Sequence, residues 1–241
     1  MMKRRDFISL VGGAAAAWPL AARTQQALPV VGLLHYASPD TFAHIAEAVR
    51  RGLKEAGHVE GQHVSIDYRW AYGHYDRLPA LAADLVRRQV TVLIAGGTVA
   101  ARAAKEATAT IPVVFTSGAD PVWSGLVASL GRPGANLTGA SLIAAEMAAK
   151  RLELTRELLP HARAVAMVVN PNYPGADSEM AEVEAAGRII GLRTDKLTAG
   201  SEEEIDAAFA SLAQRNVDAV MVGADGFLYR VPENVTLGRF P

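Results

Sequence analysis

From Pro29 onward, short runs of apolar residues alternate with stretches in which apolar residues recur at helical spacing. This alternation is typical of parallel α/β units, because the strands of a parallel sheet are buried between helices and read as continuous apolar runs. The predicted strands in the first half of the chain are 30–35, 63–70, 90–95 and 112–116, and the predicted helices are 40–56, 75–88 and 98–107.

The same alternation resumes further along the chain. The predicted helices are 120–130, 144–159, 177–190 and one that begins at Ser201, and the predicted extended segments are 137–142, 165–170, 192–197 and 217–222. Two sets of βα units joined by an extended segment predict an α/β protein of two Rossmann-like lobes, each with a parallel sheet, connected by a hinge near 138–141. We expect an N-terminal lobe at 28–140 and a second lobe at 141–225.

The chain after residue 225 departs from this rhythm. Residues 226–241 are interrupted by Pro and Gly and contain no amphipathic helix to cover the last predicted strand. We expect an irregular tail, a truncated chain with an incomplete second lobe, and uncovered apolar faces at Val217, Val220 and Val222. The alternative is a compact natural variant whose tail packs back on the lobe.

Composition and charge exclude several classes of protein. Hydrophobic residues make up 50% of the chain and charged residues 20%, which is not the composition of a disordered protein. The chain has no Cys, so disulfides, thiolate metal sites and cysteine nucleophiles are excluded. A net charge of −1 argues against a nucleic-acid partner, which would require a concentrated basic face.

The first 27 residues have the pattern of an export signal. Arg4 and Arg5 precede the apolar stretch 7–22, which is shorter than the roughly 20 residues that span a bilayer. The paired arginines predict a twin-arginine signal peptide at 1–27, with an ordinary secretory signal as the alternative. We therefore expect a periplasmic protein with no membrane anchor after the signal is removed.

Loops with small, hydroxyl or amide residues follow several predicted strands. In parallel sheets, ligands bind at the carboxyl ends of the strands, where helix N-termini present free N–H groups. We therefore predict a ligand site at these loops, although turn and cap chemistry is the alternative explanation for each loop taken singly. The predicted ligand-binding residues are Tyr36, Ser38, Trp70, Gly97, Thr98, Ser117, Asp120, Asn170 and Asp225.

The residue types at these loops suggest a ligand with two polar ends. Thr98, Ser117 and helix N–H groups suit an anionic end, while Asn170 or Asp225 suits a polar or cationic end. Trp70 follows the second predicted strand in a chain with only 6% aromatic residues. It is predicted either to stack on the ligand or to pack beneath its own loop.

Signatures of enzymes are weak in this chain. The segment 96–98 (GGT) lacks the later glycine of a dinucleotide-binding loop, and Ser117 does not belong to a Gly-x-Ser-x-Gly elbow. We predict no catalytic residue, no cofactor and no metal site. The alternative is an exported α/β hydrolase that uses Ser117 or Asp120, which a histidine within hydrogen-bond reach of either side chain would support.

Five sequence stretches carry a family resemblance. They are 115–121 (FTSGADP), 132–139 (RPGANLTG), 149–154 (AKRLEL), 68–71 (YRWA) and 168–171 (VVNP). Together they resemble the ABC-transporter substrate-binding proteins of the tryptophan-binding type, from about residue 28 to 225. The resemblance implies a type I periplasmic-binding-protein fold, a small organic ligand such as an amino acid, and an inner-membrane ABC permease as partner. Ala135 and Tyr72 depart from the family's pattern.

Overall fold

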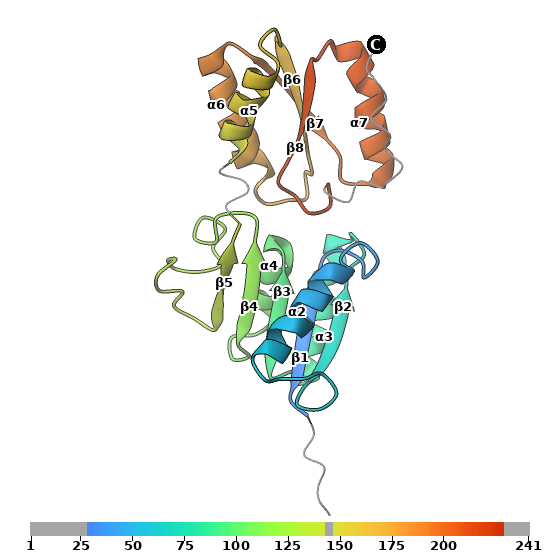
Figure 1. The fold of residues 1–241 in the computed structure, drawn as a ribbon, viewed down its shortest axis with the longest axis vertical. Coiled ribbons are helices and arrows are strands. Elements are labelled where there is room, and N and C mark those ends of the chain that lie inside the picture. Colours follow the sequence, from blue (N-terminus) through green and yellow to red (C-terminus); the bar gives the residue numbers. More distant parts are fainter. Residues whose placement is uncertain (1–27, 143–146, 229–241) are drawn as a thin grey trace, which may run out of the picture.

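Two parallel α/β lobes follow one another along the chain in the computed structural model, which describes residues 28–142 and 147–228 (Figure 1). The predicted signal peptide at 1–27, the start of the predicted helix 144–159 and most of the predicted tail at 226–241 lie outside the described residues. Each lobe has its own sheet and its own buried core. Within the described ranges, no helix is both long enough and apolar enough to cross a membrane.

The first lobe contains a five-stranded parallel sheet in the order β2-β1-β3-β4-β5. Helix α2 covers one face of this sheet, and helices α3 and α4 pack side by side on the other (Figure 1). The elements are β1 (Val30–His35), α2 (Ala43–Glu55), β2 (Ser65–Trp70), the 3-10 turn η1 (Tyr75–Arg77), α3 (Leu78–Arg87), β3 (Val92–Gly96), α4 (Thr98–Ala107), β4 (Val113–Ser117) and β5 (Leu137–Ser141).

The second lobe contains a smaller sheet of three parallel strands in the order β7-β6-β8. Helices α5 and α6 pack together on one face, and α7 covers the other (Figure 1). The elements are α5 (Ala148–Leu158), β6 (Ala164–Val169), α6 (Ala176–Ile190), β7 (Arg193–Thr198), α7 (Glu202–Arg215) and β8 (Ala219–Val222). Ser201 caps α7 as its sequence predicts, because its Oγ accepts the N–H of Glu204 at 3.2 Å.

The helix expected at 120–130 is wrong. This segment forms turns, in which Asp120 Oδ1 accepts the backbone N–H of Val122 at 2.6 Å. Such local side-chain bonds compete with the helical hydrogen-bond ladder. The apolar residues Leu126 and Val127, which produced the helical pattern, are instead buried in the core of the first lobe.

The expected apolar exposure at the end of the second lobe is not found. Val217, Val220 and Val222 are half-buried and pack against a core cluster on the α7 side of the sheet. Phe227 and Leu228, in the turn after β8, are buried in the same cluster. The exposure expected at the three valines is therefore wrong, because α7 and this turn cover them.

Candidate ligand-binding site

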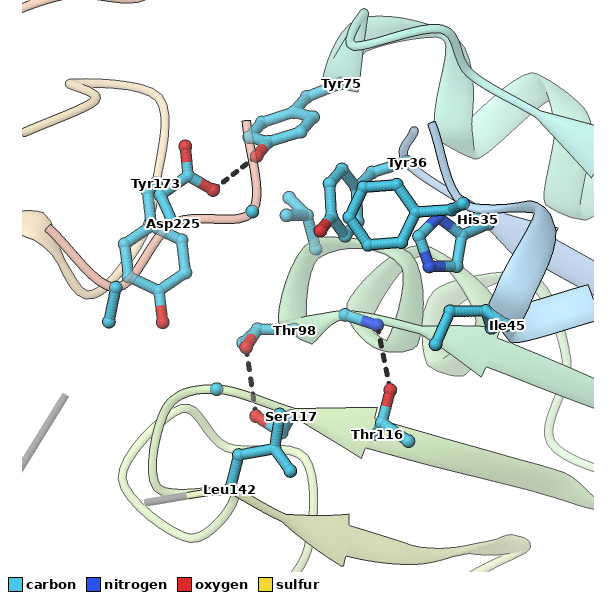
Figure 2. Close-up of a pocket in the computed structure, with 16 residues that line it drawn as sticks. His35, Tyr36, Ile45, Tyr75, Thr98, Thr116, Ser117, Leu142, Tyr173 and Asp225 are labelled. Carbon is cyan, nitrogen blue, oxygen red and sulfur yellow. Dashed lines mark hydrogen bonds between the residues drawn. The ribbon is translucent and has the colours of Figure 1, made fainter. Parts of the chain in front are cut away.

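A cavity of about 300 Å³ lies between the two lobes, where the carboxyl ends of strands from both sheets converge (Figure 2). Its volume is at the lower end of the range of about 300–1,000 Å³ found for small-molecule sites. The first lobe contributes, among others, His35, Tyr36, Tyr75, Gly97, Thr98 and Ser117, and the second lobe contributes Tyr173, Ala224, Asp225 and Gly226.

The structure brings together part of the predicted site. The residues on the predicted list that line the cavity are Tyr36, Gly97, Thr98, Ser117 and Asp225. Asn170 is buried behind Asp225 and contacts its carboxylate. Ser38, Trp70 and Asp120 do not line the cavity.

Hydroxyl groups of β4 and α4 meet on the first-lobe side of the cavity. Thr98, the first residue of α4, lies with its Oγ1 2.9 Å from the Oγ of Ser117. Ser117 Oγ donates to the carbonyl of Ala119 at 2.7 Å, so its single proton is used and Thr98 donates in the Thr98–Ser117 bond. An anionic group here would meet the positive end of the α4 dipole, and rotation of the Thr98 hydroxyl would supply one further donor.

Gly97 brings the α4 N-terminus close to the aromatic wall. Its φ is +94°, a conformation that favours glycine, and a Cβ at this position would lie 2.7 Å from the ring of Tyr36. Gly97 N–H donates to the carbonyl of Thr116 at 3.1 Å. The glycine therefore allows Tyr36 and the start of α4 to line one cavity.

The acid of the site comes from the second lobe. Asp225 follows β8 and accepts a hydrogen bond from the hydroxyl of Tyr75, across the lobes (Figure 2). It also accepts one from Asn170 Nδ2 at 2.6 Å. Burial raises the pKa of Asp225 above its ordinary value, and the bonds from Tyr75 and Asn170 oppose that rise. The backbone N–H groups of Phe227 and Gly226 lower it as well, so donors already surround the carboxylate and what it offers a cationic group is its negative charge.

His35 adds no positive charge to the cavity at neutral pH. Burial lowers the pKa of its imidazole to about 4, with a smaller contribution from His44. Its Nδ1 accepts the N–H of Ala37 at 3.1 Å. The lining among the described residues contains no Lys or Arg, so the fixed charge at the cavity wall is the carboxylate of Asp225.

An aromatic cluster forms the wall nearest α2. The ring centroids of His35 and Tyr36 are 4.6 Å apart, and those of Tyr36 and Tyr75 are 6.0 Å apart with perpendicular planes. Phe42 packs against His35 at 4.9 Å. These rings provide flat apolar area beside a polar site, which suits a ligand with an apolar or aromatic side chain.

Trp70 is placed in the packing position rather than at the cavity. It lies behind the aromatic wall, with its ring 5.3 Å from that of His35, and stacks parallel to Tyr68 at 6.4 Å. Its separation from the cavity follows from the strand order, because β2 is the edge strand and Trp70 pairs with His35 of β1, whose ring lies between Trp70 and the cavity.

Replacement of Trp70 by Ala is expected to lower the free energy of unfolding by about 2 kcal/mol, below the 3–5 kcal/mol typical of a fully buried Trp, because Trp70 is half-buried. Relative affinities within a ligand series should not change, since its ring does not line the cavity. Urea denaturation and a binding series of aromatic and aliphatic ligands measure the two effects. A loss confined to flat ligands would contradict the packing role.

Ser38 and Asp120 act in local turns. Ser38 Oγ lies 2.9 Å from Thr41 Oγ1, just before α2. Asp120 accepts backbone N–H groups of the turn that follows it. For these two loops the structure shows the turn and cap chemistry that was the alternative explanation.

Several residues that line the cavity are not among the predicted site residues, and four of them are His35, Tyr75, Tyr173 and Gly226. His35 is the last residue of β1 and Tyr173 lies in the loop between β6 and α6, whereas Tyr75 begins η1 and Gly226 follows Asp225. A position at the carboxyl end of a strand, or in the loop that follows it, is the signal that could have identified His35 and Tyr173. Tyr75 carries no such signal, because it reaches the cavity through a contact with the other lobe.

A second buried acid, Glu179 of α6, lies outside the cavity lining. Burial raises its pKa from an ordinary 4.5 to about 7; the Ala224 N–H and Arg151 lower it, while Glu182 and Asp225 raise it further. The folded state therefore holds this proton more tightly than the unfolded chain. The stabilisation is complete below pH 4.5 and is lost as the pH rises through 7.

Replacement of Glu179 by Gln removes this titration. The melting temperature of the variant minus that of the wild type is therefore expected to rise by several degrees between pH 4.5 and 7 and then to level off. Thermal melts of both proteins in matched buffers measure the difference, in which the titrations of other groups cancel. A difference independent of pH would contradict the assignment.

Two parallel α/β lobes with a cavity between the carboxyl ends of their strands define a two-lobed binding protein. The chain belongs to the ABC transporter substrate binding protein family, whose model matches residues 30–231. The expected type I periplasmic-binding-protein fold, with a small second sheet, is confirmed.

The chain is similar to several known proteins. It is 26% identical over 179 residues to a "Tyrosine-binding protein" of Clostridioides difficile (strain R20291), covering 74% of this chain and 51% of that protein. A conserved domain protein of Vibrio cholerae superposes with a TM-score of 0.73 at 28% identity, over 80% of this chain and 64% of that one. An ABC domain in complex with L-Trp from Streptococcus pneumoniae gives a TM-score of 0.73 at 24% identity, over 83% and 66%. The chain thus spans about half the length of the curated relative.

Proposed function

We propose that this protein is a periplasmic solute receptor that binds an amino acid or a related small molecule and delivers it to an inner-membrane ABC permease. Family membership and the similarity to a protein named for tyrosine binding support this proposal. The observation that carries it is the cavity itself, which is lined by the α4 N-terminus and Thr98 from the first lobe and by Asp225 from the second.

This arrangement matches the chemistry of an α-amino acid. The carboxylate of the ligand is held by Thr98 and by N–H groups at the start of α4, while the ammonium group binds Asp225. Thr98 exchanges its bond to Ser117 for one to the ligand carboxylate, Asn170 holds Asp225 in place, and Tyr36, Tyr75 and Tyr173 surround the ligand side chain. Because the two polar ends are bound by different lobes, the ligand favours the arrangement in which the lobes approach each other.

The hydrolase alternative is not favoured. Ser117 Oγ is engaged by Thr98 and by the Ala119 carbonyl, and Asp120 accepts N–H groups of its own turn. Over residues 28–142 and 147–228, no histidine is hydrogen-bonded to either side chain. The proposed site does not contain a nucleophile paired with a base, and a receptor requires neither.

A thermal-shift and calorimetric screen of the full chain tests the proposed function. The panel contains the twenty amino acids, small carboxylates and, as a matched pair, L-tyrosine and its des-amino analogue 3-(4-hydroxyphenyl)propanoate. A ligand at about 100 times its dissociation constant adds roughly 2.7 kcal/mol of stability, which such a screen detects. No shift by any amino acid, in protein that unfolds cooperatively, would overturn the proposal.

Replacement of Thr98 by Val is expected to weaken binding of a ligand carboxylate by about 3- to 10-fold, because one hydroxyl donor contributes roughly 0.5–1.5 kcal/mol. Replacement of Ser117 by Ala should have a smaller effect on affinity, since the Ser117 proton is donated to Ala119. Isothermal titration of both variants measures the contrast. Equal losses would contradict the separate roles of the two hydroxyls.

A further inference from the structure

The loop that carries Asp225 is anchored, on the side away from the cavity, by the buried acid Glu179. Glu179, on α6, is 1% exposed, and its two oxygens lie 3.0 and 2.9 Å from the backbone nitrogen of Ala224, whose N–H they accept. Ala224 immediately precedes the acid that faces the cavity. An oxygen of Glu179 accepts this N–H whether the group is ionised or protonated, so the contact fixes the peptide next to Asp225.

Arg151, on α5, holds the same segment one step earlier. Its Nη2 donates to the carbonyl of Val222, the last residue of β8, at 2.6 Å. Its Nη1 lies 3.6 Å from Glu179 Oε1, so the guanidinium also faces the carboxylate. Helices α5 and α6 thus hold two neighbouring peptide groups at the end of β8, through residues 71 and 45 positions away in the sequence.

The space between these anchors is fully occupied. A Cβ on Gly223 would lie 3.2 Å from Glu179 Oε2 and 3.2 Å from the carbonyl of Val168. Beyond the anchors, the Asp225 carboxylate itself is oriented by Asn170 and Tyr75. Neither Glu179 nor Arg151 lines the cavity, so any effect of theirs on a ligand must pass through this loop.

We infer that Glu179 and Arg151 are positioning residues, which hold segment 222–225 in the conformation that directs the Asp225 carboxylate into the cavity. The inference rests on the proposed function in one respect, namely that Asp225 binds the cationic end of the ligand. A loop held rigid before binding loses less conformational entropy when the ligand arrives, which raises affinity.

Amide hydrogen exchange of the ligand-free full chain tests the positioning itself. Glu179→Met removes the acceptor at similar size, Glu179→Gln keeps one acceptor oxygen, and Glu203→Gln removes an exposed acid of α7 as the matched control. Exchange of the Ala224 amide is expected to accelerate at least tenfold in Glu179→Met, and to change little in Glu179→Gln and Glu203→Gln. Arg151→Gln should likewise accelerate exchange within 222–226. This variant replaces Glu179→Met in the test if Glu179→Met does not fold.

Two results of the exchange experiment would overturn the inference. One is unchanged protection at 222–226 in both Glu179→Met and Arg151→Gln. The other is an acceleration spread evenly over the second lobe, which a merely structural role would produce. Because this experiment uses no ligand, it decides the inference even if the screen shows that the proposed function is wrong.

Binding to the matched ligand pair then tests the connection to Asp225. Glu179→Met is expected to weaken L-tyrosine at least fivefold more than the des-amino analogue. The double variant Glu179→Met/Asp225→Asn should bind L-tyrosine no more weakly than Asp225→Asn alone, because both changes remove one interaction. Equal losses for the two ligands, or additive losses in the double variant, would overturn the role assigned to Glu179.

Discussion

Replacement of Asp225 by Asn is expected to weaken the binding of an amino acid by about 10- to 100-fold. The change removes the carboxylate that faces the cavity, and a hydrogen bond to a charged group contributes roughly 1.5–3 kcal/mol, or one to two powers of ten in affinity. The loss is expected to be large because Asp225 is 1% exposed, so little water screens the pair. Isothermal titration with L-tyrosine measures it.

The des-amino analogue is the internal control for this prediction. It lacks the ammonium group, so its affinity should change less than about threefold if Asp225 acts on that group alone. Asparagine also alters the local bonding, because Asn170 donates to the Asp225 carboxylate through Nδ2. Tyr75→Phe, which removes a donor to Asp225 without removing its charge, separates this local effect from the loss of charge. A similar loss for both ligands would show that the ammonium group binds elsewhere.

Most of the fold could be predicted from the sequence because the strands are continuous apolar runs. Strands β1, β3 and β6 consist of residues that the sheet buries between helices, so their pattern carries the α/β architecture. The segment 120–130 shows the limit of this reasoning. Its apolar residues enter the core from a turn, and the side-chain bonds of Asp120 that prevent the helix are not part of a hydrophobic pattern.

The site could be predicted as a set of loops but not as a set of side chains. Parallel topology places the ends of β1, β3, β4, β6 and β8 at the cavity, which the order of elements already implies. The direction of each side chain depends on contacts between distant segments. Tyr75 and Asp225 are 150 positions apart, and the sequence around neither residue indicates that the two side chains form a hydrogen bond. Trp70 was predicted as a site residue because aromatic residues are rare in this chain, whereas the pairing of β2 with β1 places it behind His35.

Replacement of Gly226 by Ala is expected to prevent the observed approach of the lobes. A Cβ on Gly226 would lie 1.8 Å from Tyr36 Oη and 2.0 Å from its Cζ. Tyr36 cannot swing aside, because its ring packs against His35, Phe42 and Tyr75. Relief therefore requires the lobes to separate, which breaks the bond between Tyr75 and Asp225.

The affinity of Gly226→Ala for an amino acid should fall by about 5- to 150-fold, the equivalent of the roughly 1–3 kcal/mol that overpacking costs, and small-angle scattering should show a larger radius of gyration. Gly131→Ala is the matched control, because a Cβ there meets nothing within 4 Å. Adding Tyr36→Ala to Gly226→Ala removes the obstructing ring and should restore the radius of gyration, although not the affinity, since Tyr36 itself lines the cavity. If Gly226→Ala keeps the wild-type radius and affinity, contact between Tyr36 and Gly226 does not limit how closely the lobes approach.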